Sequence, residues 1–163
     1  VVAHADANKD RLDSVLDAMG KMSQHLDSQV SSYVNMGSGA LLAEIAKNDH
    51  VAFKRRILDG VLRRIDLHAD GIPDHTQCRF GIWYSSITAP EIRAMHAYTA
   101  IATPHLDVHA WAKKALNLAD QGKIDDAFSA VEEMGRASQQ VLTLLEELGT
   151  GLHQADEARL FED

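Results

Sequence analysis

Residues with apolar character, and one glutamine among them, recur at alternating intervals of three and four in the first part of the chain. They are Leu12, Val15, Met19, Met22, Leu26, Gln29, Tyr33 and Met36. This spacing keeps one seam of a helix facing a partner helix, so it predicts a coiled coil. An ordinary bundle helix is the alternative, but a run of more than three heptads favours the coiled coil. We expect residues 1–38 to form a coiled-coil helix, an arm or linker, that pairs with a second copy of the chain in a homodimer.

Helical periodicity continues through the rest of the chain, and prolines are scarce, which predicts an all-α protein. Further helices are expected at about 40–66, 90–120 and 124–148. The second of these must be kinked or split at Pro104, because proline has no amide hydrogen to donate and clashes with the preceding turn.

A loop rich in Gly, Pro and Asp separates the first two of these helices. Within it, Asp74 is expected to cap a short helix that carries Cys78 and ends or bends at Gly81. The predicted fold is therefore an antiparallel four-helix bundle with a short inserted Cys-bearing helix and an N-terminal coiled-coil helix. We expect residues 39–163 to form the bundle domain and residues 1–38 to form the arm.

The charge balance narrows the classes of partner. The chain of 163 residues has 24 acidic and 16 basic residues, for a net charge of -8. Nucleic acids and anionic membranes are negative too, so we expect neither as a partner. The longest uncharged stretch, residues 28–43, is too short and too rich in Ser, Asn and Gly to span a bilayer. The chain starts at Val1 with no basic-then-apolar signal pattern, so we expect a fragment of a longer protein, with a small standalone module as the alternative.

Histidine and cysteine provide the candidate chemistry, with nine His and a single Cys in the chain. His105 and His109 are four residues apart on a helix, so their side chains leave the same face. His50 lies on the apolar stripe of another helix, and Cys78 lies on the turn between the two helices. Imidazole nitrogen and thiolate sulfur are the ligands that Zn²⁺ prefers in tetrahedral sites. One ion could therefore join the two helices and the turn.

Spacing alone leaves other interpretations open. A buried histidine is often a satisfied core residue, and a single cysteine is often a small buried hydrophobe. His75, three residues before Cys78, and His96, in the same helical region as His105, are alternative ligands. A catalytic zinc keeps an open position for water, which four protein ligands would not leave. The residues between His105 and His109 include no glutamate that could act as a base, so we predict no enzymatic activity and no catalytic residues.

Three sequence elements together resemble the chemoreceptor zinc-binding domain. They are Asp49-His50 with Phe53-Lys54, the run Cys78-Arg79-Phe80-Gly81-Ile82-Trp83-Tyr84, and Pro104-His105 with Val108-His109. The family has an early histidine, a C-x-x-G-x-W-Y element and a late H-x-x-x-H pair, and the intervals of 28, 27 and 4 residues suit it. The resemblance covers about residues 42–148. The family usually has a basic residue after the glycine of the cysteine element. This chain has Ile82 there, a change that does not affect the ligands.

The resemblance implies a helical bundle with a 3-His/1-Cys zinc site formed by His50, Cys78, His105 and His109. It also implies a cytoplasmic sensory module of bacterial chemoreceptors, the methyl-accepting chemotaxis proteins, or of diguanylate cyclases. The partner would then be the signalling domain of the host protein, with its chemotaxis kinase complex or cyclase.

A zinc-bound thiolate is still an oxidisable nucleophile. The leading hypothesis is a sensor that couples zinc or oxidant status at Cys78 to the adjoining coiled coil. The alternatives are a regulatory zinc domain of a diguanylate cyclase and a purely structural zinc bundle.

Overall fold

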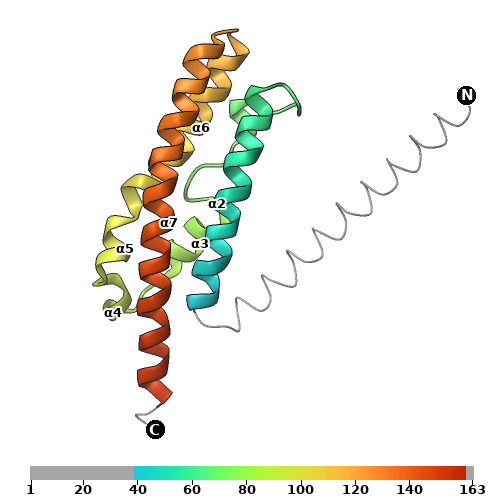
Figure 1. The fold of residues 1–163 in the computed structure, drawn as a ribbon. Helices are drawn as coiled ribbons and strands as arrows, with labels where there is room; N and C mark the ends of the chain where they lie inside the picture. The colour runs from blue at the N-terminus through green and yellow to red at the C-terminus, as the bar shows by residue number, and fades with distance from the viewer. Residues whose placement is uncertain (1–38, 161–163) are drawn as a thin grey trace, which may run out of the picture. The chain divides into compact units, whose positions relative to one another are not determined.

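Three long helices form the framework of residues 39–160, the part of the chain that the computed structural model describes (Figure 1). These helices are α2 (Gly39–Val61), α6 (Ala102–Asp120) and α7 (Ile124–Leu160). Shorter elements connect α2 to α6: η1 (Ala69–Gly71), α3 (Arg79–Ser86), α4 (Pro90–Arg93) and α5 (His96–Ala100). The described residues contain no strand, which confirms the predicted all-α class.

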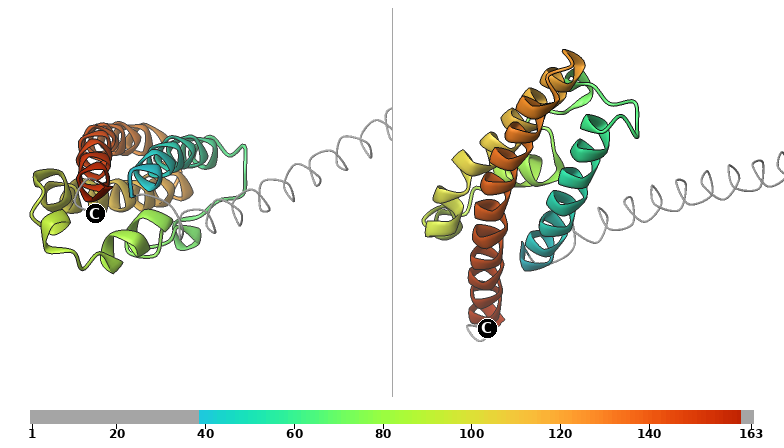
Figure 2. Two further views of the ribbon diagram at one scale, coloured as in Figure 1. Left: turned by 90° about the horizontal axis from the view of Figure 1, so that it is seen from below. Right: turned by 45° about the horizontal axis from the view of Figure 1, so that its top comes forward.

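The core lies where the apolar stripes of the three long helices meet. The largest of its fully buried side chains include Ile57 of α2, Leu116 of α6, and Met134, Leu145 and Leu148 of α7. Seen end-on, the long helices lie side by side and the short helices lie around their outside (Figure 2). The predicted coiled-coil helix falls outside the described residues. Residues 39–160 contain three long helices and several short ones, and the four-helix arrangement of the bundle stays a prediction.

Helix α2 ends at Val61, earlier than the predicted residue 66. The chain turns there because Arg63 adopts a left-handed backbone conformation, with φ of 56°. The amide of Arg64 then donates to the carbonyl of Asp59 at 2.9 Å, which is the 6→1 hydrogen bond of a Schellman C-cap. The Arg63 guanidinium pairs with Asp120 at 2.7 Å, so the ends of α2 and α6 are joined.

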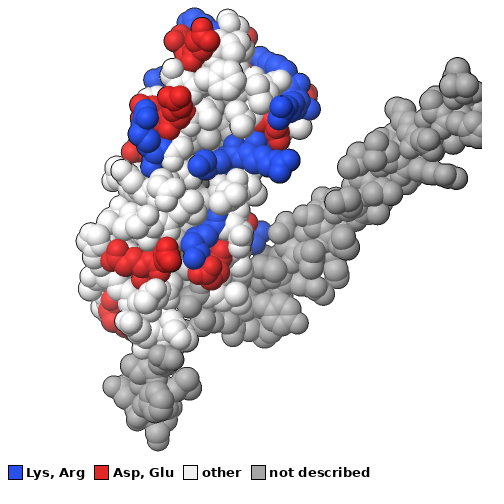
Figure 3. All heavy atoms as spheres, viewed as in Figure 1, with Lys and Arg blue, Asp and Glu red and all other residues white. Residues whose placement is uncertain are grey.

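Basic side chains gather over the C-terminal part of α2 on the face drawn in Figure 3. Several of them lie beside carboxylates. Asp59 lies 3.9 Å from Arg55 and 3.3 Å from Arg64. These pairs are solvent-exposed, so each contributes little to stability.

The Cys78 region differs from the prediction. The Asp74 carboxylate accepts from the Thr76 amide at 3.0 Å and closes a tight turn, but it does not cap a helix. Cys78 itself is the N-cap of α3, and its Sγ accepts from the Gly81 amide at 3.3 Å. Gly81 therefore lies inside the first turn of α3, not at a helix end, and Trp83 belongs to the helix.

The region from residue 90 to 120, predicted to be helical with a kink or split at Pro104, is three helices. Pro90 is the first residue of α4, as expected, but the chain breaks again before α5 and at Ile101. Pro104 lies in the first turn of α6, where the missing amide hydrogen has no partner to lose. The predicted split is therefore present: α5 ends at Ala100, four residues before Pro104, whose ring has no amide hydrogen to donate to the Ala100 carbonyl.

Helix α6 ends at Asp120, as predicted, and the chain turns at Gly122, which adopts a φ of 75°. Helix α7 begins at Ile124 as predicted, but it continues to Leu160 through Gly151. A β-carbon at Gly151 would lie 3.2 Å from the sulfur of Met95, so the glycine lets Met95 pack closely against α7. None of the helices in residues 39–160 combines the length and the apolar character that crossing a bilayer requires.

Candidate metal centre

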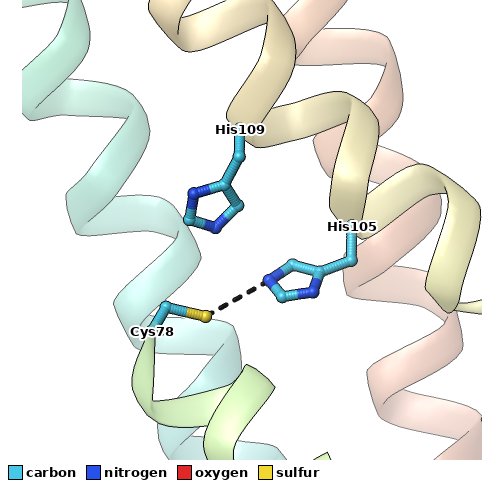
Figure 4. Close-up of side chains that lie close together, drawn as sticks. All are labelled: Cys78, His105 and His109. Atoms are coloured by element: carbon cyan, nitrogen blue, oxygen red, sulfur yellow. Dashed lines mark hydrogen bonds between the residues drawn. The ribbon is translucent and has the colours of Figure 1, made fainter. Parts of the chain in front are cut away.

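Side chains from two separate elements converge beside α2 (Figure 4). Cys78 comes from the start of α3, and His105 and His109 come from successive turns of α6. One ligand atom of each lies within 4.8 Å of the others. The Cys78 sulfur lies 3.3 Å from Nε2 of His105. A single ion could contact all three side chains.

His50 reaches the same place from α2. Its ring centroid is 5.3 Å from that of His105, and the residue is only 5 % exposed. Its Nδ1 lies 2.9 Å from the carbonyl oxygen of Ala46. A carbonyl can only accept, so Nδ1 carries the proton and Nε2 keeps a lone pair. That Nε2 is buried and has no hydrogen-bond partner among the described residues. Leaving a buried polar atom unsatisfied costs about 1–3 kcal/mol, and a metal ion would satisfy it.

His109 is oriented in the same way by a different segment. Its Nδ1 lies 3.0 Å from the carbonyl oxygen of Pro73, so its Nε2 also carries the lone pair. Metal-binding histidines commonly donate their second nitrogen to a carbonyl or carboxylate, which fixes the tautomer and the ring. The carbonyls of Ala46 and Pro73 thus prepare His50 and His109 to bind a metal through Nε2.

Burial keeps the three imidazoles neutral, the form that binds metals. Burial first, and then the repulsion that protonated neighbouring imidazoles would exert, lower the pKa of His105 to about 3. Burial also lowers the pKa of His50 and of His109. It raises the pKa of the Cys78 thiol, although hydrogen bonds from backbone amides such as that of Gly81 act in the opposite direction. A bound dication deprotonates a coordinating thiol and would overcome this effect.

The turn before Cys78 packs unusually tightly against Gly81. A β-carbon on Gly81 would lie 1.9 Å from the carbonyl oxygen of His75, a distance that no side-chain rotation can relieve. The Cys78 sulfur lies 3.3 Å from that same oxygen and 3.3 Å from the Gly81 amide. The glycine three residues after the cysteine therefore allows the close approach that positions the sulfur.

The donor set fits zinc. A tetrahedral ion with bonds of about 2.0–2.3 Å holds neighbouring ligand atoms about 3.3–3.6 Å apart. The observed 3.3 Å between the Cys78 sulfur and His105 Nε2 already lies at that separation. Three imidazoles and one thiolate are also ligands that zinc accepts together.

The alternative histidines are placed differently. Nδ1 of His75 lies 3.0 Å from the Asp74 carboxylate, while its ring lies edge-on to His105 with centroids 5.9 Å apart. His75 thus borders the cluster. The His96 side chain is 75 % exposed and pairs with Glu147 at 3.1 Å. The structure brings Cys78, His105 and His109 together and places His50 beside them, while the ligand set itself stays a prediction.

The carbonyls of Ala46 and Pro73 were not recognised in the sequence. Every residue has a carbonyl group, so no residue type marks one that orients a ligand. Only the position of Ala46, one helical turn before His50, could have indicated its role.

A comparison with known families finds a match, which covers the region of this helical His/Cys site. The family model for the chemoreceptor zinc-binding domain matches residues 50–116, which confirms the resemblance. The matched segment begins at His50 and includes Cys78, His105 and His109. The family is one of zinc-binding sensory domains and is not a known catalytic family. No curated protein and no solved structure matches the chain.

Proposed function

We propose that this chain is the zinc-binding sensory part of a bacterial signal-transduction protein of the chemoreceptor type. One Zn²⁺ per chain would be held by His50, Cys78, His105 and His109. The observation that carries the proposal is the buried, unpartnered Nε2 of His50 beside the cluster of the other three residues. A diguanylate cyclase is the alternative host, and a purely structural zinc bundle is the alternative role.

The helices that carry these four residues are the elements that the ion would connect. His50 belongs to α2, Cys78 begins α3, and the remaining pair belongs to α6. Zinc would supply a cross-link among these elements and would hold the sulfur as a thiolate. The Ala46 and Pro73 carbonyls would keep the rings of His50 and His109 in place while the ion binds or leaves.

The proposed domain division follows from this role. Residues 39–163 would form the zinc-binding bundle, in a four-helix arrangement, and residues 1–38 would form the coiled-coil arm that passes its state to the signalling domain of the host. The proposed location is the cytoplasm, where the kinase complex or cyclase would be available as partner. The four protein ligands leave no open position, so we propose no catalysis at the metal.

Metal analysis of the purified chain tests the ligand set. The wild type is expected to contain one zinc per chain. The double variant His105→Ala and His109→Ala is expected to contain none after dialysis, because half of the donor set is lost. His50→Ala is expected to lower zinc affinity by at least tenfold in a competitive titration. His75→Ala is the matched control and should keep full occupancy.

Two outcomes would contradict this assignment. Full zinc occupancy in the double variant would show that the two histidines of α6 are not zinc ligands. Loss of zinc in His75→Ala, with retention in His50→Ala, would replace the early ligand by the histidine of the Cys78 turn.

We further propose that the heptad of the first 36 residues makes the protein a homodimer. Met19→Lys with Leu26→Lys places two charges in the seam and is expected to give a monomer in light scattering. Ser14→Lys with Gln24→Lys adds the same charge away from the seam and should leave the dimer intact. A dimer that survives both pairs of changes would place the interface elsewhere in the chain.

A further inference from the structure

A cavity of about 340 Å³ lies beside the candidate metal centre, between α2, the loop at Pro73 and the start of α3. His50, Cys78 and His109 all contribute to its lining. Arg56, an exposed residue of α2, lines it too, so the cavity connects the cysteine with solvent. A solute can therefore approach Cys78 from this side.

The cavity carries a net positive charge. Its charged residues are Asp49, Arg56 and Arg79. Asp49 lies 3.5 Å from Nε of Arg79, so the charges of these two side chains offset each other. The Arg56 guanidinium remains as the excess charge of the lining. A guanidinium offers planar donors that match a carboxylate, so the cavity favours an anion over a neutral molecule of the same shape.

The walls of the cavity are apolar and partly aromatic. Phe53 and Phe80 both line it. The Phe53 ring lies 5.0 Å from the His109 ring at an interplanar angle of 31°, and the Phe80 ring lies edge-on to His105 at 5.0 Å. Apolar walls with a few polar groups are typical of small-molecule sites, and they strengthen charge interactions by excluding water.

We propose that this cavity binds small, flat organic anions, with the carboxylate at Arg56 and the apolar body against Phe53 and Phe80, and that a bound anion covers Cys78. The cavity would then select which solutes reach the responsive thiol. The regulatory role of this cavity rests on the proposed function, but anion binding itself does not require that Cys78 bind zinc.

The reaction of Cys78 with a neutral disulfide, 4,4′-dithiodipyridine, reports on the cavity because the chain has a single cysteine. The Cys78 sulfur attacks one sulfur of the probe and forms a new disulfide. The sulfur–sulfur bond of the probe breaks, and pyridine thiolate leaves with the electron pair. Benzoate is expected to slow this reaction with saturation, while benzamide, which has the same ring and no charge, slows it less. Equal protection by the two compounds would overturn the proposal.

Two neighbouring arginines provide a matched pair of variants. Arg56→Gln is expected to weaken protection by benzoate about threefold or more, because one charge at the cavity is lost. Arg55→Gln changes the net charge equally, but the Arg55 side chain is 86 % exposed, lies 3.9 Å from Asp59, and is not part of the lining. It should keep the protection seen in the wild type. The rate without benzoate, measured for each variant, corrects for any change in the thiol itself.

Equal loss of protection in both variants would mean that benzoate senses the general charge of α2, and the proposed site would be wrong. Zinc content is measured in the same samples. Protection that depends on Arg56 in a protein without zinc would contradict the proposed function and leave the anion site standing. Full zinc content without protection that depends on Arg56 would contradict the anion site and leave the proposed function standing.

Discussion

Replacing Gly81 with alanine is expected to disrupt the Cys78 turn and weaken zinc binding together. The new β-carbon would lie 1.9 Å from the His75 carbonyl oxygen and 2.9 Å from the Thr76 α-carbon. Both are backbone atoms, so the clash can be relieved only if the turn and α3 move apart. Overpacking of this kind costs about 1–3 kcal/mol of the free energy of unfolding. It also displaces the Gly81 amide from the Cys78 sulfur, and loss of such a supporting contact typically costs 10–100-fold in metal affinity.

Denaturant unfolding and a competitive zinc titration measure the two effects of Gly81→Ala. Gly135→Ala in α7 is the matched control, because a β-carbon there would have nothing within 4 Å. The control variant should bind zinc as the wild type does and should be more stable by about 0.5–1 kcal/mol, as expected for glycine in a helix. A Gly81→Ala protein with wild-type stability and affinity would show that the turn is not closed as described.

Local sequence signals predicted some element boundaries correctly. The turn at Gly122 and the start of α7 follow from a glycine that adopts a positive φ and from the apolar stripe that begins after it. Pro90 at the first position of α4 is another local effect. In these places neighbouring residues alone decide the conformation.

Tertiary packing decided the boundaries that the sequence predicted wrongly. Gly81 was expected to end or bend the short helix, as glycine often does at a C-cap, but its role is to admit the backbone of His75. Gly151 similarly does not end α7, since Met95 packs against it. Asp74 has the chemistry of a helix cap, yet the cap is Cys78, which is not among the preferred capping residues.

The sequence indicated which side chains of the candidate site lie close together, while the ligand set stays a prediction. Ligand chemistry and the spacing of His105 and His109 indicated one helical face, and the structure places both beside Cys78. Choosing His50 over His75 needed the family resemblance. The observation that supports His50, a buried Nε2 without a partner among the described residues, is visible only in three dimensions.

Removal of zinc is expected to lower stability and to loosen residues 74–84 while the long helices persist. Zinc would bind only the folded state, and at a free concentration a thousandfold above its Kd it stabilises by about 4 kcal/mol. Oxidation of Cys78 by hydrogen peroxide should release zinc as well, because the oxidised sulfur is no longer a thiolate donor. Chelator or peroxide should therefore lower the unfolding midpoint, and far-ultraviolet circular dichroism below that midpoint should change little.

The structure indicates why the loosening stays local. The buried side chains that join the long helices, such as Ile57, Leu116 and Leu145, belong to the apolar core and not to the ligand set. The far end of α3 is held independently: the hydroxyl of Tyr84 donates to the Tyr98 carbonyl at 3.0 Å, and the hydroxyl of Tyr98 donates back at 3.1 Å. The two rings also stack, with centroids 4.3 Å apart. The loosening of residues 74–84 is thus expected to be largest at the turn and Cys78 and smallest toward Tyr84, which Tyr98 holds.

Hydrogen exchange, measured before and after peroxide treatment, locates the change. Amides of residues 74–84 should lose protection, and those in the middle of α7 should keep it. Cys78→Ser is the control for oxidation. Peroxide does not oxidise the serine hydroxyl, so amide exchange at residues 74–84 of this variant should be the same before and after treatment. Unchanged protection at residues 74–84 in the wild type, despite loss of zinc, would mean that the metal does not hold the turn. The proposal that Cys78 acts as a switch would then be wrong, and zinc at this site would have a purely structural role.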